Sequence, residues 1–168
     1  HHHLRSVLMI NDLKLKALTP SDITHFEELV TLFGEVFEMK EFQVPPREYL
    51  LKLLGRNHFH VFVAMKEDTV VGGSTVYTLH HYYSEKPYAY IFDLAVANRF
   101  QRQGIGSALV NEVKSYFQRL GYAEVFVQAD RADGYAVDFY RKTKPTEEED
   151  VLHFYYSLPQ EEVLQTNT

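Results

Sequence analysis

Apolar and polar residues alternate or cluster along this chain in ways that predict strands. Alternation over residues 12–18 predicts a strand with one buried face. Short apolar runs predict further strands over residues 59–65, 69–79, 89–96, 123–130 and 151–158. Lys66-Glu67-Asp68 is expected to form a hairpin turn, and residues 80–88 a loop. The run at 89–96 is so apolar that we expect both faces of this strand to be covered.

Helical spacing of apolar residues separates these strand-like segments. It predicts helices over residues 19–34, 47–54, 105–120 and 134–142. Thr19, followed by a proline, supplies a start signal for the first helix, and Gly55 and Gly121 are expected to end the second and third. Gly72 and Gly73 lie inside a strand, where they predict a bulge or a close backbone approach.

The order of the segments predicts one α/β domain with a mixed sheet. Because a helix connects strands 89–96 and 123–130, those two strands are expected to be parallel neighbours. Residues 9–159 are expected to form this domain. We expect residues 1–8 to come from a tag or vector and residues 160–168 to be a flexible tail.

Composition and charge exclude several kinds of chemistry. The chain has no cysteine, which excludes disulfides, thiolate metal ligands and a cysteine nucleophile. The formal charge of −6 argues against nucleic acid and suits a cationic partner, although solubility alone explains the same sign. No membrane-length apolar run or signal segment is visible, so we expect no membrane partner and a cytoplasmic location. The histidines lack a third ligand at motif spacing, so no metal site is expected.

The stretch Gln101-Arg102-Gln103-Gly104-Ile105-Gly106-Ser107 lies between a predicted strand and a predicted helix. The first turn of a helix has unpaired N–H groups and the positive end of the dipole, so it can bind an anion. Glycine lets a phosphate approach the backbone closely. A Walker loop and a dinucleotide fingerprint both require residues that are absent here, and a glycine-containing helix start without a ligand is the remaining alternative.

An apolar strand, Q-x-x-G-x-G, a long helix and a parallel strand together resemble the acetyl-CoA-binding motif of the GNAT superfamily of N-acetyltransferases. Within it, the chain is most similar to aminoglycoside 3-N-acetyltransferases of the gentamicin-modifying type. The segments that carry this resemblance are YIFDLAV (90–96), RQGIGSAL (102–109), VQAD (127–130), AVDFYRK (136–142) and EDVLHF (149–154). The segments LFGEVF (32–37) and YLLKLL (49–54) are similar as well.

The resemblance implies a GNAT fold in which the two parallel strands splay apart at the centre of the sheet and admit acetyl-CoA. Backbone groups of Leu94, Ala95 and Val96 would pair with the pantetheine arm, and one N–H there would stabilise the oxyanion. The pyrophosphate would be held by Arg102, Gln103, Gly104, Ile105, Gly106 and Ser107. A homodimer is also implied.

Tyr140 matches the superfamily tyrosine near the departing sulfur and is the candidate general acid, with a core tyrosine beside Phe139 as the alternative. Asp93 is costly inside an apolar strand, so it is either the group that deprotonates the amine or a carboxylate satisfied by neighbours. Asp130 and Asp133 follow a parallel strand, where they would bind a cationic substrate or simply form a turn.

The resemblance predicts acetyl transfer to a primary amine of an aminoglycoside, at the 3-position, which would confer antibiotic resistance. The charged stretch RKTKPTEEED (141–150) is longer than the corresponding turn in relatives and borders the expected substrate entrance. Two alternatives therefore stay open. One is acetylation of a polyamine, an amino acid or a protein N-terminus, and the other is a non-catalytic CoA-binding regulatory domain.

Overall fold

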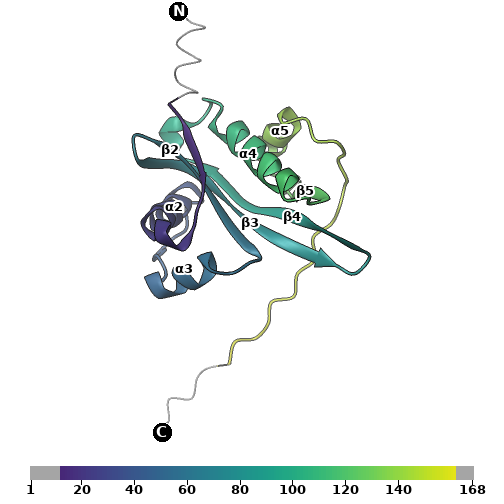
Figure 1. Ribbon diagram of the computed structural model, residues 1–168, viewed down its shortest axis with the longest axis horizontal. Helices are drawn as coiled ribbons and strands as arrows, with labels where there is room; N and C mark the ends of the chain where they lie inside the picture. The colour runs from purple at the N-terminus through teal and green to yellow at the C-terminus, as the bar shows by residue number, and fades with distance from the viewer. Residues whose placement is uncertain (1–11, 162–168) are drawn as a thin grey trace, which may run out of the picture.

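A five-stranded sheet carries helices on both faces in the computed structural model, which describes residues 12–161 (Figure 1). The strands lie in chain order and are β1 (Lys14–Ala17), β2 (Phe59–Lys66), β3 (Thr69–His81), β4 (Ser84–Val96) and β5 (Glu124–Val127). The helices are the 3-10 turns η1 (Pro20–Asp22) and η2 (Asn98–Phe100) and the α-helices α2 (Ile23–Val36), α3 (Arg47–Leu54), α4 (Ile105–Arg119) and α5 (Gly134–Lys142). The first four strands are antiparallel neighbours, whereas β4 and β5 are parallel. The predicted mixed α/β sheet with a parallel pair is therefore confirmed.

Two apolar clusters form the core, one on each face of the sheet. Phe26 and Leu29 of α2 and Leu50 of α3 are buried in the first cluster. Leu109 and Phe117 of α4 are fully buried in the second cluster. Helices α2, α3 and α4 each bury an apolar stripe against the sheet, and their polar residues face the water on the opposite side.

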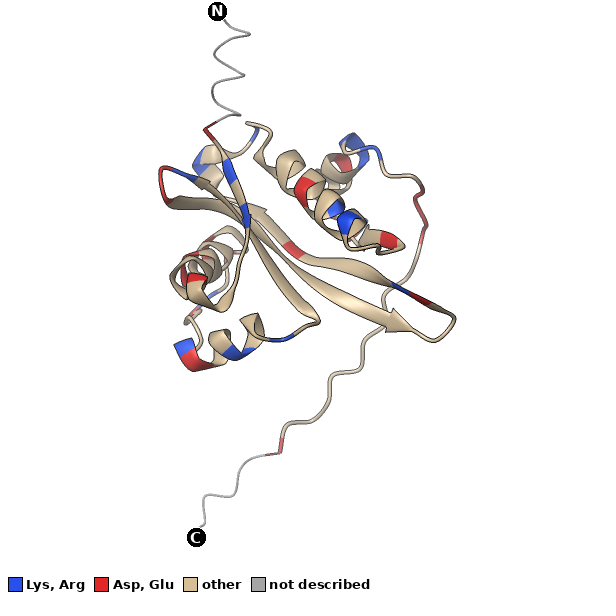
Figure 2. Ribbon diagram, viewed as in Figure 1, with Lys and Arg blue, Asp and Glu red and all other residues tan. Residues whose placement is uncertain are grey.

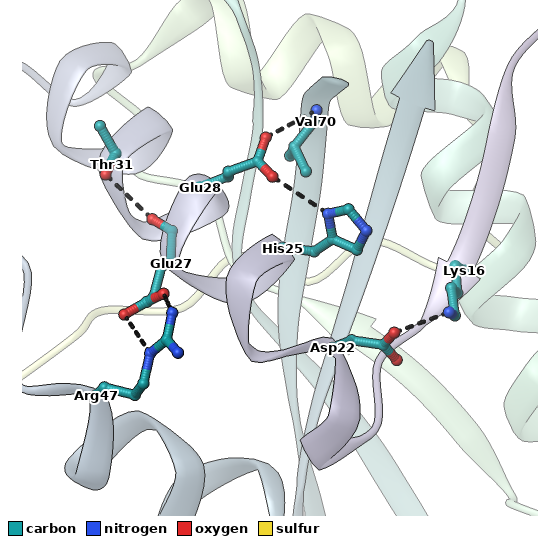
Figure 3. A network of polar contacts seen from close by, with 8 residues as sticks. All are labelled: Lys16, Asp22, His25, Glu27, Glu28, Thr31, Arg47 and Val70. Atoms are coloured by element: carbon teal, nitrogen blue, oxygen red, sulfur yellow. Dashed lines mark hydrogen bonds and ion pairs between the residues drawn. The ribbon is translucent and has the colours of Figure 1, made fainter. Parts of the chain in front are cut away.

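Ion pairs fasten α2 and the η1 turn that precedes it to two other elements, β1 and α3 (Figure 3). Lys16 of β1 donates to Asp22 over 2.8 Å, and this bond lowers the pKa of the carboxyl. Asp22 and Thr19 also form a capping box at the start of η1. Glu27 accepts two hydrogen bonds from Arg47, the first residue of α3, at 3.1 and 2.5 Å. These two ion pairs thus hold the start of α2 to strand β1 and hold α2 to α3.

The glycine pair in β3 marks a close approach, as predicted. A Cβ on Gly73 would lie 2.5 Å from Cδ1 of Leu29 and 2.6 Å from the carbonyl oxygen of Phe62. A Cβ on Gly72 would lie 2.9 Å from the carbonyl oxygen of Ala95. In the pairing of β3 with β2, Val71 is the extra residue, so β3 itself bulges directly beside Gly72, as predicted. The absence of side chains here lets α2 and β4 pack directly onto the β3 backbone.

Several sequence-based boundaries were wrong. The first strand covers only 14–17 and the last sheet strand only 124–127. The first helix continues past Gly34 to Val36, and the ring of Phe42 occupies the space beside Gly34. Residues 80–88 are not a loop: β3 and β4 continue as a hairpin and only Tyr82 and Tyr83 turn. The strand at 89–96 is not covered on both faces, because Phe92 is 57% exposed.

Residues 151–158 form no strand, which contradicts the prediction. This segment leaves α5, runs out past the sheet, and every one of its residues is exposed (Figure 1). Its sequence favours a strand, but a strand needs a partner for its backbone groups, and none of the described residues supplies one. As a result the parallel pair lies at the edge of the sheet and not at its centre.

The expected tag remnant at 1–8 and most of the expected tail at 160–168 lie outside the described residues. Within residues 12–161, no helix combines the length and the apolar character that a bilayer crossing requires.

Candidate active site

A bulge in β4 opens a gap between β4 and β5. Phe92 is an extra residue in the pairing of β4 with β3, and a bulge bends the strand that contains it. β5 pairs with β4 only from Tyr88 to Ile91, immediately before the bulge. Between the bulge and Val96, β4 keeps its pairing with β3 but has no strand on its other side among residues 12–161. β5 therefore does not pair with β4 beyond the bulge, in agreement with the splayed pair that the family resemblance implied.

Leu94, Ala95 and Val96 lie on this unpaired stretch. An extended ligand can bind to such an edge as an added strand, because the edge presents free backbone N–H and C=O groups. The predicted binding residues of β4 thus lie where an extended, amide-containing ligand arm can pair with them.

The turn before α4 concentrates backbone N–H groups. The helix's first internal bond runs from Ala108 N–H to the carbonyl of Gly104, so the N–H groups of Ile105, Gly106 and Ser107 have no partner one turn earlier. φ is +64° at Arg102 and +85° at Gly104, a left-handed backbone that aims neighbouring N–H groups toward one side. The turn is built to hold an anion at the helix N-terminus.

Gln101 holds this turn in place. Its side-chain amide donates to the carbonyl of Val96 over 3.1 Å and to Asn98 Oδ1 over 3.2 Å. Its Oε1 accepts a 3.5 Å hydrogen bond from Tyr135 of α5. One glutamine side chain thereby connects the open end of β4, the anion turn and the start of α5. The Q of the Q-x-x-G-x-G pattern was the sequence signal for this role, although the pattern alone did not assign it.

Gly106 determines how closely α5 approaches α4. A Cβ at this position would lie 2.9 Å from Cε1 and Cζ of Phe139, so the ring occupies the space that any larger residue would need. Phe139 precedes Tyr140 and the two rings pack edge to face, with centroids 4.9 Å apart. The position of Tyr140 therefore depends on the absence of a side chain in the anion turn.

Asp93 acts electrostatically on Tyr140. Burial raises the pKa of Tyr140 to about 12, with the negative charge of Asp93 as the second cause and that of Asp133 as the third. Burial also raises the pKa of Asp93, although Thr75 Oγ1 donates a 3.3 Å hydrogen bond to its Oδ2 and works in the opposite direction. The site therefore contains a carboxylate that is a stronger base than usual and a phenol that stays protonated at neutral pH.

Asp130 and Asp133 lie in the exposed turn between β5 and α5. Asp130 Oδ1 accepts a 2.9 Å hydrogen bond from the N–H of Ala132. Asp133 caps α5, accepting a 3.1 Å hydrogen bond from the N–H of Ala136. Both residues thus have the turn-forming role that was the alternative to substrate binding, and Asp133 is still near enough to raise the pKa of Tyr140.

Two further residues at the site were missed by sequence reasoning. Thr75 of β3 is buried and binds Asp93, but threonine is common in strands and gave no signal. Lys66 at the end of β2 donates to Gln103 over 3.2 Å and lines a pocket of about 250 Å³ with Gly104 and Ser107. Lys66 precedes Gln103 by 37 positions, so local patterns could not connect them.

The part of the chain that the structure describes contains no group of three or more potential metal ligands. His60, one of the histidines considered for that role, is bound to Thr78 Oγ1 over 2.7 Å. Thr78 in turn lies 2.8 Å from the hydroxyl of Tyr122, which makes this a buried polar chain within the core.

The acetyltransferase (GNAT) family model matches residues 26–144. No curated protein matches the chain in sequence. Among solved structures, an aminoglycoside acetyltransferase from an uncultured soil metagenomic sample, in complex with sisomicin, is 53% identical. The match covers 90% of this chain and 99% of the relative, with a TM-score of 0.88.

Two more solved structures extend this likeness. A second aminoglycoside acetyltransferase from an uncultured soil metagenomic sample is 34% identical over 88% of this chain and 99% of its own, with a TM-score of 0.81. An aminoglycoside N-acetyltransferase in complex with CoA is 15% identical over 87% of this chain and 95% of its own, with a TM-score of 0.69. At that identity the third likeness shows the fold alone.

Proposed function

The chain belongs to the acetyltransferase (GNAT) family, and from this premise we propose that it transfers acetyl from acetyl-CoA to a primary amine of an aminoglycoside. One observation carries the proposal. The open stretch of β4 leads through η2 into the anion turn at the start of α4, and Asp93 on that stretch is close enough to Tyr140 of α5 to raise its pKa. The acceptor class is supported by the 53% identical relative in complex with sisomicin.

The chain's own groups fit acetyl-CoA along its length. The N–H groups of the turn 102–107 would hold the pyrophosphate, with Lys66 as a cation beside them. Leu94, Ala95 and Val96 would pair with the amides of the pantetheine arm. When bound, acetyl-CoA supplies a thioester that the amine attacks. A backbone N–H of the open β4 edge would stabilise the oxyanion that forms.

We assign Asp93 to proton removal from the substrate ammonium, directly or through a water molecule. An amine must lose a proton before it can act as a nucleophile, because a lysine-like ammonium has a pKa of ~10.4. The raised pKa of Asp93 makes its carboxylate a better base than an exposed aspartate. The amine's electron pair then forms the new C–N bond.

We assign Tyr140 to the departing sulfur. As the C–S bond breaks, its electron pair stays on sulfur, and the phenol donates a hydrogen bond to that developing charge. The pKa of Tyr140 is about 12, whereas an ordinary thiol has a pKa of ~8.5, so the phenol stabilises the thiolate chiefly as a charge-assisted donor. The proton released by the amine balances the charge that leaves with CoA.

Asp130 and Asp133, together with the overall negative charge, would attract a polycationic sugar to the entrance. We further propose the 3-amino group as the acetylated position, resistance to the antibiotic as the outcome, the cytoplasm as the location and a homodimer as the assembly.

The decisive experiment measures CoA thiol release from acetyl-CoA across a panel of aminoglycosides, polyamines, amino acids and peptide N-termini. We expect turnover with gentamicin-type antibiotics, and NMR of the product identifies the acetylated nitrogen. Turnover on polyamines or peptides with none on the antibiotics would refute the acceptor but keep the transferase chemistry.

A Tyr140→Phe variant separates catalysis from simple CoA binding. It should lower kcat by ~10²-fold or more while calorimetry shows unchanged CoA affinity. If neither the parent protein nor the variant turns over any amine, yet both bind CoA, the regulatory alternative is correct and the enzymatic one is wrong.

A further inference from the structure

Aromatic side chains gather on the face of the sheet opposite α4. Ala89 and Ile91 of β4 pack into the core under α4, as does Val125 of β5. Successive residues of a strand point to opposite faces, so their neighbours point to the face that carries α2 and α3. The β3–β4 hairpin extends beyond these two helices (Figure 1). The rings on that face, which we call the aromatic patch, are Tyr77 of β3, Tyr88, Tyr90 and Phe92 of β4, and Phe126 of β5.

The five rings of the aromatic patch contact one another without a gap. Tyr90 stacks on Phe126 with centroids 4.7 Å apart and planes 9° apart, and Tyr88 lies 6.3 Å from Phe126. Phe92 meets Tyr77 at 5.6 Å and 89°, and Tyr90 at 5.9 Å and 84°. None of the five is buried, and Phe92 is 57% exposed. A face of a sheet that meets water normally carries polar residues, so a contiguous aromatic surface there indicates a binding site.

The bulge in β4 joins the aromatic patch to Asp93. Ile91 and Leu94 both pack into the core under α4, although they are three positions apart instead of two. The two residues between them, Phe92 and Asp93, therefore both point to the opposite face. Burial raises the pKa of Tyr77, and the negative charge of Asp93 is the second cause, so this ring also lies near the carboxylate. The patch thus begins at the group that we assign to proton removal from the acceptor amine.

The chemistry of the aromatic patch fits a cationic ligand made of saturated rings. Between Lys86 and Asp93, β4 contains no charged residue, so this stretch is tan in Figure 2. Aromatic rings attract ammonium groups over their faces, and the C–H side of a sugar ring packs against an aromatic side chain. The hydroxyl of Tyr90 donates to Oε1 of Gln128 over 3.2 Å, so its oxygen can still accept a hydrogen bond from an ammonium or a sugar hydroxyl.

We propose that the aromatic patch binds the rings of the aminoglycoside that are not acetylated. One ring presents its amine at Asp93, and the linked rings lie along Phe92, Tyr90 and Phe126 with their ammonium groups against the aromatic side chains. Tyr88 and Phe92 are four positions apart on one strand, about 13 Å, which is longer than a single sugar ring. This inference rests on the acceptor proposed above and adds which part of the antibiotic the chain recognises.

Calorimetry of gentamicin binding to the full chain, with CoA at saturation, tests the aromatic patch without relying on turnover. Tyr90→Leu and Phe92→Leu each remove a ring but keep an apolar side chain, and each should raise the Kd for gentamicin roughly 3- to 10-fold. Tyr90→Phe keeps the ring and should recover most of that affinity. Tyr82→Leu is the control, because it removes a ring that is 99% exposed at the hairpin tip, outside the patch, and it should leave the Kd unchanged.

Two further measurements separate stacking from a general effect on the fold. The leucine variants should lose less affinity for 2-deoxystreptamine, a single ring with two amines, than for the three-ring antibiotic. In proton NMR, C–H protons of the rings that are not acetylated should shift upfield on binding to the parent, because aromatic ring currents shield them, and should shift less with either leucine variant.

The outcomes distinguish the aromatic patch from the acceptor itself. A parent protein that binds no aminoglycoside would refute both the acceptor and this inference. If the parent binds gentamicin and both leucine variants bind it equally well, the patch alone is wrong. An equal loss of affinity for 2-deoxystreptamine, or for CoA measured without antibiotic, would likewise show that the rings support the fold and would overturn the patch while keeping the acceptor.

Discussion

Replacing Gly106 with alanine should lower turnover far more than stability. The added Cβ would lie 2.9 Å from two ring carbons of Phe139, whereas carbon atoms normally contact at ~3.5–4.0 Å, so the ring must retreat by roughly 0.6–1 Å. Overpacking of this kind costs ~1–3 kcal/mol, and the better helix propensity of alanine returns ~1 kcal/mol. The expected net loss in unfolding free energy is therefore about 0–2 kcal/mol.

The effect on catalysis follows from the neighbour of Phe139. Tyr140 moves with this ring on α5, and a misplacement of ~1 Å in a catalytic constellation costs on the order of 10²-fold in rate. CoA affinity should change little, because the N–H groups of the turn remain in place. Initial rates of thiol release, calorimetry with CoA and thermal unfolding measure the three quantities separately.

Gly134→Ala is the matched control. Gly134 is the first residue of α5, the helix that carries Phe139 and Tyr140. A Cβ added to Gly134 would meet no atom within 4 Å, and the φ of Gly134 is not positive. This variant should keep the parent rate. Parent-like turnover in Gly106→Ala, or an equal loss in both variants, would refute the idea that the Gly106–Phe139 contact positions Tyr140.

Three more predictions concern other features. Asp93→Asn should lower kcat at least ~10²-fold. It should also abolish the fall in rate at acidic pH, because protonation of Asp93, whose pKa is raised by burial, causes that fall. A pH profile like that of the parent would contradict the role of Asp93 as the base. Gly73→Ala should lower the free energy of unfolding, measured in urea, by ~1–3 kcal/mol, because the added Cβ overlaps Leu29. Gly55→Ala is the control and should lower it much less, because a Cβ at Gly55 would contact no atom closer than 3.6 Å. Burial lowers the pKa of His60, so the folded protein favours the neutral ring. The contribution of this neutral ring to the free energy of unfolding should be complete above pH ~6.5 and should decline as pH falls below that value. Unfolding at pH 7.5 and 5.5 should therefore show a smaller decline in His60→Gln than in the parent.

The elements that the sequence predicted well have strong periodic patterns and residues at their ends that favour a start or a stop. The helix at 105–119 has an apolar stripe and ends before Gly121, whose φ is +81°. The hairpin at 80–88 was misread because its residues are polar or aromatic, and its pairing depends on cross-strand contacts that no local pattern reveals. Residues 151–158 fail for the opposite reason, since strong strand propensity cannot say whether a partner strand is present.

The candidate site was predictable where residues lie close in sequence. The turn 101–107 and the β4 stretch with Asp93 stood out as a motif in context. The bulge at Phe92 was not visible, although it separates β4 from β5, because it exists only in the register between two strands. The contact of Gly106 with Phe139 and the bond from Thr75 to Asp93 also require long-range packing that sequence spacing does not encode.

The open stretch of β4 has a practical consequence for the protein before it meets its ligand. An unpaired edge inside a sheet is a place where another chain's backbone can attach, so the ligand-free protein should be the form most prone to aggregation. A bound pantetheine arm would occupy that edge and shift the equilibrium toward the native state by mass action, by ~2.7 kcal/mol at a CoA concentration about one hundred times its Kd. Saturating CoA would thus act as a chaperone-like additive, protecting the protein during expression, heating and storage through the same backbone groups that align the thioester.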